Sequence, residues 1–266
     1  MSDSKPSKVF MFDNGDPEVQ GAYEKARETF RYFWRELAWE YRRIIPALDL
    51  ACVKAPFSDG DGANRDEGQP AAEQMWINEV EFDGKTISGT LVNAPNWVTS
   101  VKQGDAVRKE IAEITDWMYG IGGVVYGAFT VNLMRSRMSK GERNDHDSAW
   151  GLDFGDPETI RIVPQKKSWF SRKPPEIQEH PMSEAMASDL MAQVKKDPSM
   201  LTVTDDRGWT YLHQLALAGS AAGVKVLLDA GMNVNILTRD GRTAKQLAAS
   251  LGWNKVVDLL ASKGAR

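Results

Sequence analysis

Three polar residues that could do chemistry stand side by side at Asp145, His146 and Asp147. A histidine between two carboxylates can bind a metal or transfer protons. No second histidine or cysteine lies at ligand spacing, and no nucleophile motif accompanies the three residues. The other interpretation is a polar helix or cap whose histidine is solvated or hydrogen-bonded. We therefore rank an enzyme centred on these residues last among the candidate functions and expect a non-enzymatic protein.

The segment 58–70 is rich in Asp, Gly and Asn and resembles a calcium-binding loop at first sight. Asp59 and Asp61 match the first two ligand positions of an EF-hand, but Ala63 stands at the third and Asn64 replaces the required glycine. The mismatch favours a connecting loop, and we expect neither a metal nor another cofactor. The loop's acidic side chains become candidate partner-binding residues: Asp59, Asp61, Asp66 and Glu67.

The formal charge of −4 is unevenly distributed. Residues 1–163 hold 19 Lys and Arg against 27 Asp and Glu, or −8, whereas 164–182 and 183–266 each come to +2. An acidic front lacks the basic footprint that phosphate contacts need, so no direct nucleic-acid binding is expected. It suits a basic protein partner, although a mild acidic excess also serves solubility.

Two further features bear on the cellular setting. The single cysteine, Cys52, allows no intrachain disulfide, and without a histidine partner it is expected to be a small buried hydrophobe. Residues 1–8 are polar, and no apolar run has transmembrane length. We expect a cytoplasmic protein that binds no membrane.

Asp83-Gly84 lies between two strand-like runs, 75–82 and 85–92, and predicts a type I′ hairpin turn. Counting outward from the turn places one largely apolar set on the inner face: Phe82, Val80, Asn78 and Trp76, which lie opposite Lys85, Ile87, Gly89 and Leu91 in that order. The other face, which includes Met75 and Ile77, becomes more polar toward the turn.

Periodicity predicts the remaining elements of the front domain. Apolar residues spaced three and four apart indicate a helix over 17–45. Strands are predicted at 48–55, 97–102, 106–111, 114–119 and 159–163. By periodicity alone 124–138 could be a helix or a strand, and we prefer the helix. The fold class is therefore α+β, with an antiparallel sheet and a long N-terminal helix in residues 1–163. Residues 164–182, which are rich in Pro, Lys and Arg, are read as a basic linker.

The C-terminal segment, 183–266, contains an internal repeat. Gly208 and Gly241, Thr210 and Thr243, and Leu227 and Leu260 are each separated by 33 residues. This resembles the ankyrin repeat with its T-P-L-H-x-A signature, although Tyr211 replaces the proline and Leu215 the first alanine. His213 then reads as the repeat's hydrogen-bonding histidine, and residues 183–196 as a degenerate preceding unit. Two and a half repeats fall below the usual minimum of about three, so contacts with the front domain or with a partner must stabilise the array.

The ankyrin resemblance implies a small all-α domain that binds proteins through its loop tips and inner helices. The corresponding positions are Arg207, Trp209, Gln214, Arg239 and Arg242. Trp209 could pack against the front domain instead.

The front domain carries several strings of residues that look like the YegJ-like bacterial family of unknown function. They include Gln74–Ile77, Gly89–Asn93, Lys102–Asp105, Thr115–Tyr119, Leu133–Met138 and His146–Leu152, and they cover about residues 74–154. The resemblance supplies no catalytic residues. Domains of this type are often encoded near polymorphic secreted toxins, which implies an immunity role.

The first hypothesis is therefore a cytoplasmic immunity protein that binds a cognate protein toxin, a basic one such as a nuclease, delivered by a type VI-like system. The alternative is an intracellular ankyrin adaptor or regulatory scaffold unrelated to toxins.

Overall fold

The computed structural model describes residues 15–60, 69–164 and 179–265. It divides into two compact units, and both are discontinuous along the chain. The first comprises Met1–Thr29, Leu48–Glu81 and Thr86–Ile162, and the second comprises Phe30–Ala47, Phe82–Lys85 and Val163–Arg266. Most of the predicted linker, residues 165–178, lies outside the described residues.

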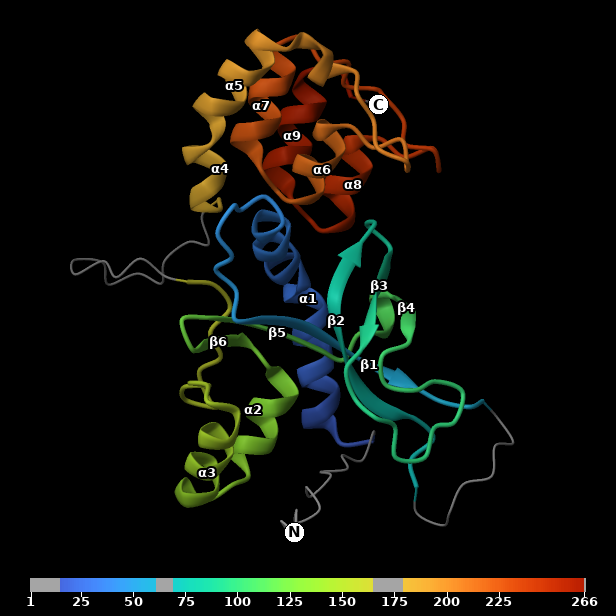
Figure 1. Ribbon diagram of the computed structural model, residues 1–266, viewed down its shortest axis with the longest axis vertical. Helices are drawn as coiled ribbons and strands as arrows, with labels where there is room; N and C mark the ends of the chain where they lie inside the picture. The colour runs from blue at the N-terminus through green and yellow to red at the C-terminus, as the bar shows by residue number, and fades with distance from the viewer. Residues whose placement is uncertain (1–14, 61–68, 165–178, 266) are drawn as a thin grey trace, which may run out of the picture. The chain divides into compact units, whose positions relative to one another are not determined.

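A six-stranded sheet with the order β4-β3-β2-β1-β5-β6 forms the centre of the first unit (Figure 1). The paired strands β1 with β2 and β5, β3 with β4, and β5 with β6 are antiparallel. The sheet and the helices confirm the predicted α+β class. The strands span Leu50–Phe57 (β1), Glu73–Phe82 (β2), Thr86–Leu91 (β3), Ala106–Glu110 (β4), Asp116–Ile121 (β5) and Val124–Gly127 (β6).

The long helix α1 spans Pro17–Glu40. Its first half packs on the sheet of the first unit, where Trp117 Nε1 donates to the Ala26 carbonyl at 2.9 Å. The helix was predicted to continue to Ile45, which is wrong. Arg43 N instead donates to the Glu40 carbonyl, and Ile44 and Ile45 are exposed. Without a buried face to cover, the apolar spacing does not extend the helix.

The hairpin of β2 and β3 forms, but its predicted inner face is only half correct. The buried apolar residues of β2 are Met75, Ile77, Val80 and Phe82, whereas Trp76 is half-buried on the other face. Two consecutive exposed residues, Asn78 and Glu79, interrupt the alternation, and Glu79 has a φ of 50°. This is the geometry of a β-bulge, which inserts one residue and exchanges the faces beyond it.

The turn of this hairpin also differs from the prediction. A type I′ turn requires positive φ at both central residues. Gly84 has a φ of 92°, but among the described non-glycine residues only Glu79 and Ala128 have positive φ. Lys85 belongs to the turn rather than to the strand, and its N–H donates to Asp83 Oδ1 at 2.9 Å. The hairpin prediction is confirmed, and its turn type is wrong.

The predicted strand at 97–102 is a loop. Val98 is buried in a cluster with residues of β1 to β4, and Trp97 and Val101 pack against it. Glu73 holds the loop by accepting the N–H groups of Asn96 and Trp97 at 2.9 and 3.3 Å. Apolar residues at these positions therefore fill the core without a ladder of hydrogen bonds. A short 3₁₀ helix, Ile111–Glu113, separates β4 from β5.

The predicted helix over 124–138 is two elements, β6 followed by helix α2 (Phe129–Ser136). The backbone changes direction at Gly127 and Ala128, which have φ values of 76° and 59°. No strand forms at 159–163. The Arg161 carbonyl oxygen accepts the Gly127 N–H at 2.8 Å, but no ladder of backbone hydrogen bonds follows. Helix α3 (Lys140–Trp150) confirms the prediction of a polar helix at this position.

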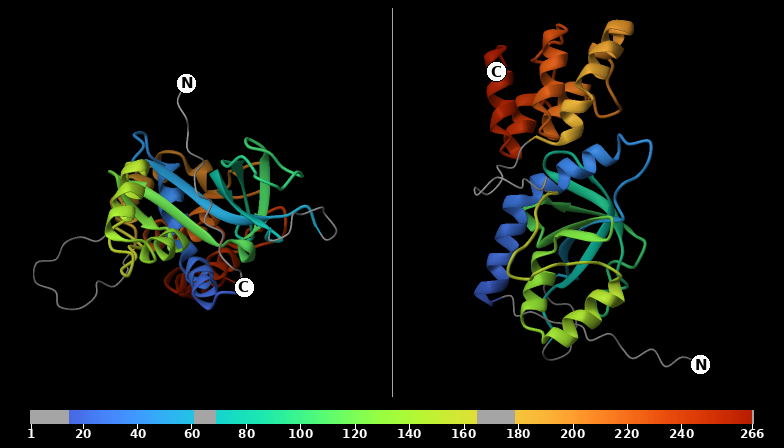
Figure 2. Two further views of the ribbon diagram at one scale, coloured as in Figure 1. Left: turned by 90° about the horizontal axis from the view of Figure 1, so that it is seen from below. Right: turned by 90° about the vertical axis from the view of Figure 1, so that its left-hand side faces the viewer.

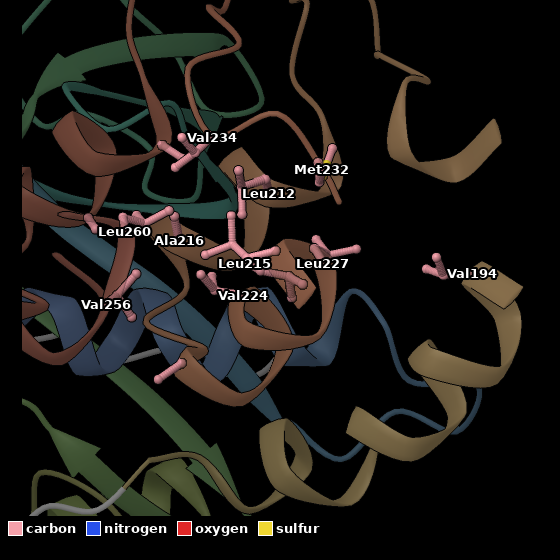
Figure 3. Packing of buried hydrophobic residues seen from close by; sticks show 14 of the residues in the cluster. Val194, Leu212, Leu215, Ala216, Val224, Leu227, Met232, Val234, Val256 and Leu260 are labelled. Atoms are coloured by element: carbon pink, nitrogen blue, oxygen red, sulfur yellow. The ribbon is translucent and has the colours of Figure 1, made fainter. Parts of the chain in front are cut away.

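The second unit contains three helix pairs stacked side by side (Figure 2). The pairs are α4 (Pro181–Ala185) with α5 (Ala187–Lys196), α6 (Tyr211–Leu217) with α7 (Ala221–Asp229), and α8 (Ala244–Ser250) with α9 (Asn254–Ser262). A 3₁₀ helix, Pro198–Leu201, follows α5. Leucine, valine and alanine side chains from these helices fill one common core (Figure 3). The predicted ankyrin fold is confirmed, with a shortened α4 in the degenerate first repeat.

Gly127 gives a direct test of the bend between β6 and α2. A Cβ at this position would lie 2.3 Å from the Trp117 carbonyl oxygen and 2.4 Å from its ring. We expect Gly127→Ala to reduce the free energy of unfolding by about 2–5 kcal/mol, from left-handed strain and overpacking combined. Urea unfolding measures this. Gly123→Ala is the control, because Gly123 has a φ of 78° but open space around it, and it should cost only about 1–2 kcal/mol. Equal losses would contradict the proposed clash.

Candidate functional site

The first unit contains a polar cluster built around Lys54, which interrupts the apolar strand β1. Lys54 lies opposite Asp116 in the register of β1 and β5. Its half-buried ammonium group donates to Thr130 Oγ1 at 2.8 Å and lies 4.4 Å from the centre of the Trp76 ring. The cluster therefore joins the middle of the sheet to helix α2.

Asp116 is fully buried and begins β5. Its carboxylate accepts the N–H groups of Phe129 and Thr130, both at 2.8 Å, and the Thr130 hydroxyl at 2.5 Å. The residue preceding α2 is Ala128, whose side chain cannot cap a helix. Asp116 therefore supplies from a distance the N-terminal cap that α2 lacks.

Charge and burial act against each other in this cluster. Burial raises the pKa of the Asp116 carboxyl, while Lys54 and the hydrogen bonds from Thr130 and Phe129 lower it. Burial likewise lowers the pKa of the Lys54 ammonium, and Asp116 opposes that change. Burial also raises the pKa of the neighbouring Cys52 thiol, which keeps it protonated and unreactive. Lys54 and Asp116 thus each have partners within the fold, and their arrangement is explained by its structural role.

A second polar cluster contains the histidine and carboxylates considered above as catalytic residues. Arg135 is buried, and its guanidinium donates to both Asp147 carboxylate oxygens at 2.9 and 2.6 Å. His146 Nδ1 lies 2.9 Å from Asp147 Oδ1, and the ring packs 5.2 Å from Phe154. Asp145 is exposed on α3. The ion pair between Arg135 and Asp147 thus links α2 to α3. Among the described residues, no group of three side chains could hold a metal ion.

The loop tips of the ankyrin array bring together several predicted partner-binding residues. Arg207 and Arg239 are exposed, and Arg239 N donates to the Arg207 carbonyl at 3.0 Å. Trp209 is buried, with the guanidinium groups of Arg207 and Arg242 at 4.9 and 5.8 Å from its ring. Trp209 is therefore a support for the two arginines rather than an exposed contact.

Two of the predicted residues contact other segments of the second unit. Gln214, on the inner helix α6, accepts a hydrogen bond from Arg42 Nη2 at 3.3 Å. Arg242 and Leu247 lie so close to Gly84 that a Cβ there would be 2.9 Å from each side chain. Part of the surface through which ankyrin arrays usually bind is thus occupied by the chain itself.

The acidic loop is described only in part. Asp59 accepts the N–H groups of Thr99 and Ser100, both at 2.8 Å. A hydrogen bond from the Ser100 side chain, together with these two N–H groups, lowers the pKa of the Asp59 carboxyl. Asp59 therefore anchors the loop that follows β3. Asp61, Asp66 and Glu67 lie outside the described residues.

Sequence reasoning missed the roles of Lys54, Asp116 and Arg135. A signal existed for Lys54, because it is the one charged residue in the apolar run of β1. Asp116 and Arg135 lie in strings that were matched to the YegJ-like family, but their partners are 12 or more residues away in sequence. Only the tertiary fold brings these groups together.

Within the described ranges, no helix is long and apolar enough to cross a membrane.

The fold defines a class of protein in which an α+β sheet unit accompanies an ankyrin array, the module that mediates protein–protein interaction. The family model described as "Uncharacterized protein conserved in bacteria (DUF2314)" matches residues 16–154, and the model for three ankyrin repeats matches 184–266. The chain belongs to the DUF2314 family of bacterial proteins and carries ankyrin repeats after it, which confirms the resemblance found in the sequence.

Three proteins are similar to all or part of this chain. The chain is 42% identical over 255 residues to a putative ankyrin repeat protein of Neisseria meningitidis serogroup B, covering 96% of this chain and 97% of that protein. It is 28% identical over 97 residues to the uncharacterised protein YegJ of Escherichia coli, covering 36% of this chain and 58% of YegJ. The human ASB11 ankyrin repeat domain aligns with a TM-score of 0.26 and 28% identity, covering 33% of this chain and 41% of that one.

The structural role of Asp116 can be tested by an isosteric change. Asp116→Asn keeps the shape but removes the charge and leaves Lys54 without its carboxylate. We expect the free energy of unfolding to fall by about 1–3 kcal/mol, because the amide Nδ2 cannot accept the buried N–H and O–H groups that one carboxylate oxygen accepts. Urea unfolding measures the change, with the exposed Asp145→Asn as control, which should stay within about 0.5 kcal/mol. A loss no larger than the control's would show that the carboxylate does not stabilise α2.

A histidine in the second repeat predicts a pH dependence. His213 Nδ1 accepts the Thr210 N–H at 3.0 Å, so this nitrogen carries no proton, and Nε2 lies 3.0 Å from the Ile236 carbonyl oxygen. Burial lowers the pKa of His213 below its ordinary value of about 6.5. In the third repeat Gln246 fills the same place, with its Oε1 accepting the Thr243 N–H at 2.8 Å.

We therefore expect stability to fall as the pH drops below about 6.5, because the unfolded chain then binds a proton that the folded protein does not. His213→Gln introduces the residue that the third repeat has at the equivalent position. It should reduce the loss of stability at low pH, even if it lowers stability at pH 7.5. Urea unfolding midpoints between pH 7.5 and 5.5 give the comparison, since all other titrating groups are common to both proteins. Parallel pH curves for the two proteins would refute the assignment.

Proposed function

We propose that the protein neutralises a cognate secreted bacterial toxin by direct binding, as a cytoplasmic immunity protein. The observation that carries the binding role is the ankyrin array with adjacent, exposed loop tips. Exposed Leu237 and Arg239 lie on one tip and exposed Val203 and Arg207 on the other. Apolar side chains beside arginines are typical of protein interfaces.

Because other segments of the second unit contact the inner helices, we expect the partner to bind at the loop tips. Gln214 and Leu247 lie 33 residues apart, at equivalent positions of α6 and α8, and both contact other parts of the second unit. A partner that used the inner helices would have to displace these contacts. The tips require no such displacement, so we assign Arg207 and Arg239 the principal role in binding.

The charge of the front segment supports a basic partner. Residues 1–163 carry a net charge of −8, which would steer a cationic toxin, such as a nuclease of a type VI-like system, toward the protein. The immunity role also rests on the family resemblance, and a regulatory adaptor is the alternative if binding occurs without protection.

The test uses the protein encoded by the neighbouring gene, expressed in cells with and without this chain. We expect that protein to be toxic alone and harmless when co-expressed. Arg207→Glu/Arg239→Glu should weaken the purified complex by at least about tenfold per residue and abolish protection, because interface arginines are frequent hot spots. Isothermal titration calorimetry measures the affinity.

The matched control is Lys195→Glu/Lys196→Glu, which makes the same charge change at exposed positions on α5. It should leave affinity and protection unchanged. General electrostatics alone would make both double variants bind a basic partner more tightly. Equal losses from both would therefore contradict a specific tip interface. A neighbouring protein that is not toxic, or is not neutralised, would remove the immunity proposal.

A further inference from the structure

The turn that follows α1, residues 41–47, exposes three large apolar side chains; we name it the isoleucine turn. Ile44 is 99% exposed, Ile45 81% and Tyr41 56%. Single exposed apolar residues are ordinary on protein surfaces. Three within five residues form a local apolar patch, which is a feature of interaction sites.

Polar contacts hold the isoleucine turn in place. Ala47 N donates to Glu40 Oε1 at 2.8 Å, which closes the turn. Arg43 forms ion pairs with Glu36 at 3.4 Å and with Glu40 at 3.5 Å. Ile44 and Ile45 are thus presented on a fixed backbone, which lowers the entropy that a bound partner would have to offset.

Arg42 adds a charge to this surface. Its Nη2 donates to Gln214 Oε1 at 3.3 Å, and its guanidinium lies 5.6 Å from the centre of the Trp39 ring. In the part of the chain that the structure describes, no carboxylate pairs with Arg42. Burial lowers the pKa of this guanidinium. A carboxylate brought by a partner would compensate the charge.

We propose that the isoleucine turn is a docking surface for a protein segment that presents apolar side chains beside a carboxylate. Ile44 and Ile45 make the apolar contact, and Arg42 pairs with the carboxylate. An amphipathic helix with an acidic edge has this chemistry. The surface includes neither Arg207 nor Arg239, and the proposal does not depend on the toxin assignment.

An anionic membrane fits the surface less well than a protein does. Two adjacent arginines beside two isoleucines resemble a membrane-binding segment, but Arg43 is already paired with Glu36 and Glu40. Residues 1–163, with a net charge of −8, would also be repelled by anionic lipids. The charges therefore favour the acidic protein segment.

The probe is a fluorescent amphipathic helical peptide of Leu and Glu, compared with a peptide in which Lys replaces every Glu. Fluorescence anisotropy with the full chain should show at least tenfold tighter binding of the Glu peptide. Ile44→Ser/Ile45→Ser should weaken that binding at least tenfold, and Arg42→Gln should remove the preference for Glu over Lys. The control is Val92→Ser, which changes another exposed aliphatic residue, 39% exposed, and should have no effect.

Circular dichroism melting checks that each variant is folded. The proposal is overturned if the Glu peptide does not bind, if the Lys peptide binds equally, or if the isoleucine substitutions have no effect. Binding of the chain to phosphatidylserine vesicles that depends on Ile44 and Ile45, without binding of the Glu peptide, would assign the surface to a membrane instead. Arg207→Glu/Arg239→Glu should leave peptide binding unchanged, which separates this result from the outcome of the toxin test.

Discussion

The burial of Trp39 among the ankyrin helices is the contact on which the second unit depends. Trp39 comes from α1, yet it belongs to the same buried cluster as Leu212, Leu215 and Val224 of the repeats. Its ring stacks on His180 at 5.6 Å, and His180 Nε2 lies 3.2 Å from Glu36 Oε1. Because three repeats are near the minimum for a stable ankyrin array, apolar area contributed from outside the repeats is significant.

Trp39 is one of several aromatic residues on α1 that face a core. Phe30, Phe33, Trp34 and Trp39 are all buried. One helix thus contributes to two cores, since the Ala26 carbonyl accepts Trp117 Nε1 in the first unit and Trp39 is buried in the second. It follows that a fragment containing only the repeats would expose an apolar surface that Trp39 covers in the full chain.

The sequence allowed the large features to be predicted because each depends on local periodicity. Spacings of three and four residues revealed α1, and the 33-residue offset between Gly208 and Gly241 revealed the array. The bulge at Glu79 was not predicted, because it depends on the positive φ of that single residue. Gly89 on the neighbouring strand could have indicated it. A Cβ at Gly89 would lie 2.3 Å from the Asn78 carbonyl oxygen, and glycine within a strand often marks such a place. The strand predicted at 159–163 does not form, because apolar composition alone does not provide a neighbouring strand with which to pair.

The candidate site was less predictable, because its buried charged side chains bind backbone groups that are distant in sequence. Glu73 accepts the backbone N–H groups of a loop, Asp116 accepts those at the start of α2, and Arg135 donates to the Gly155 carbonyl at 3.0 Å. All three buried charges bind backbone groups that are distant in sequence, so none could be paired from spacing alone. Because backbone groups buried away from water must be satisfied, these side chains fix irregular segments that no strand or helix supports. Glu73, Asp116 and Arg135 therefore each have a structural role within the first unit.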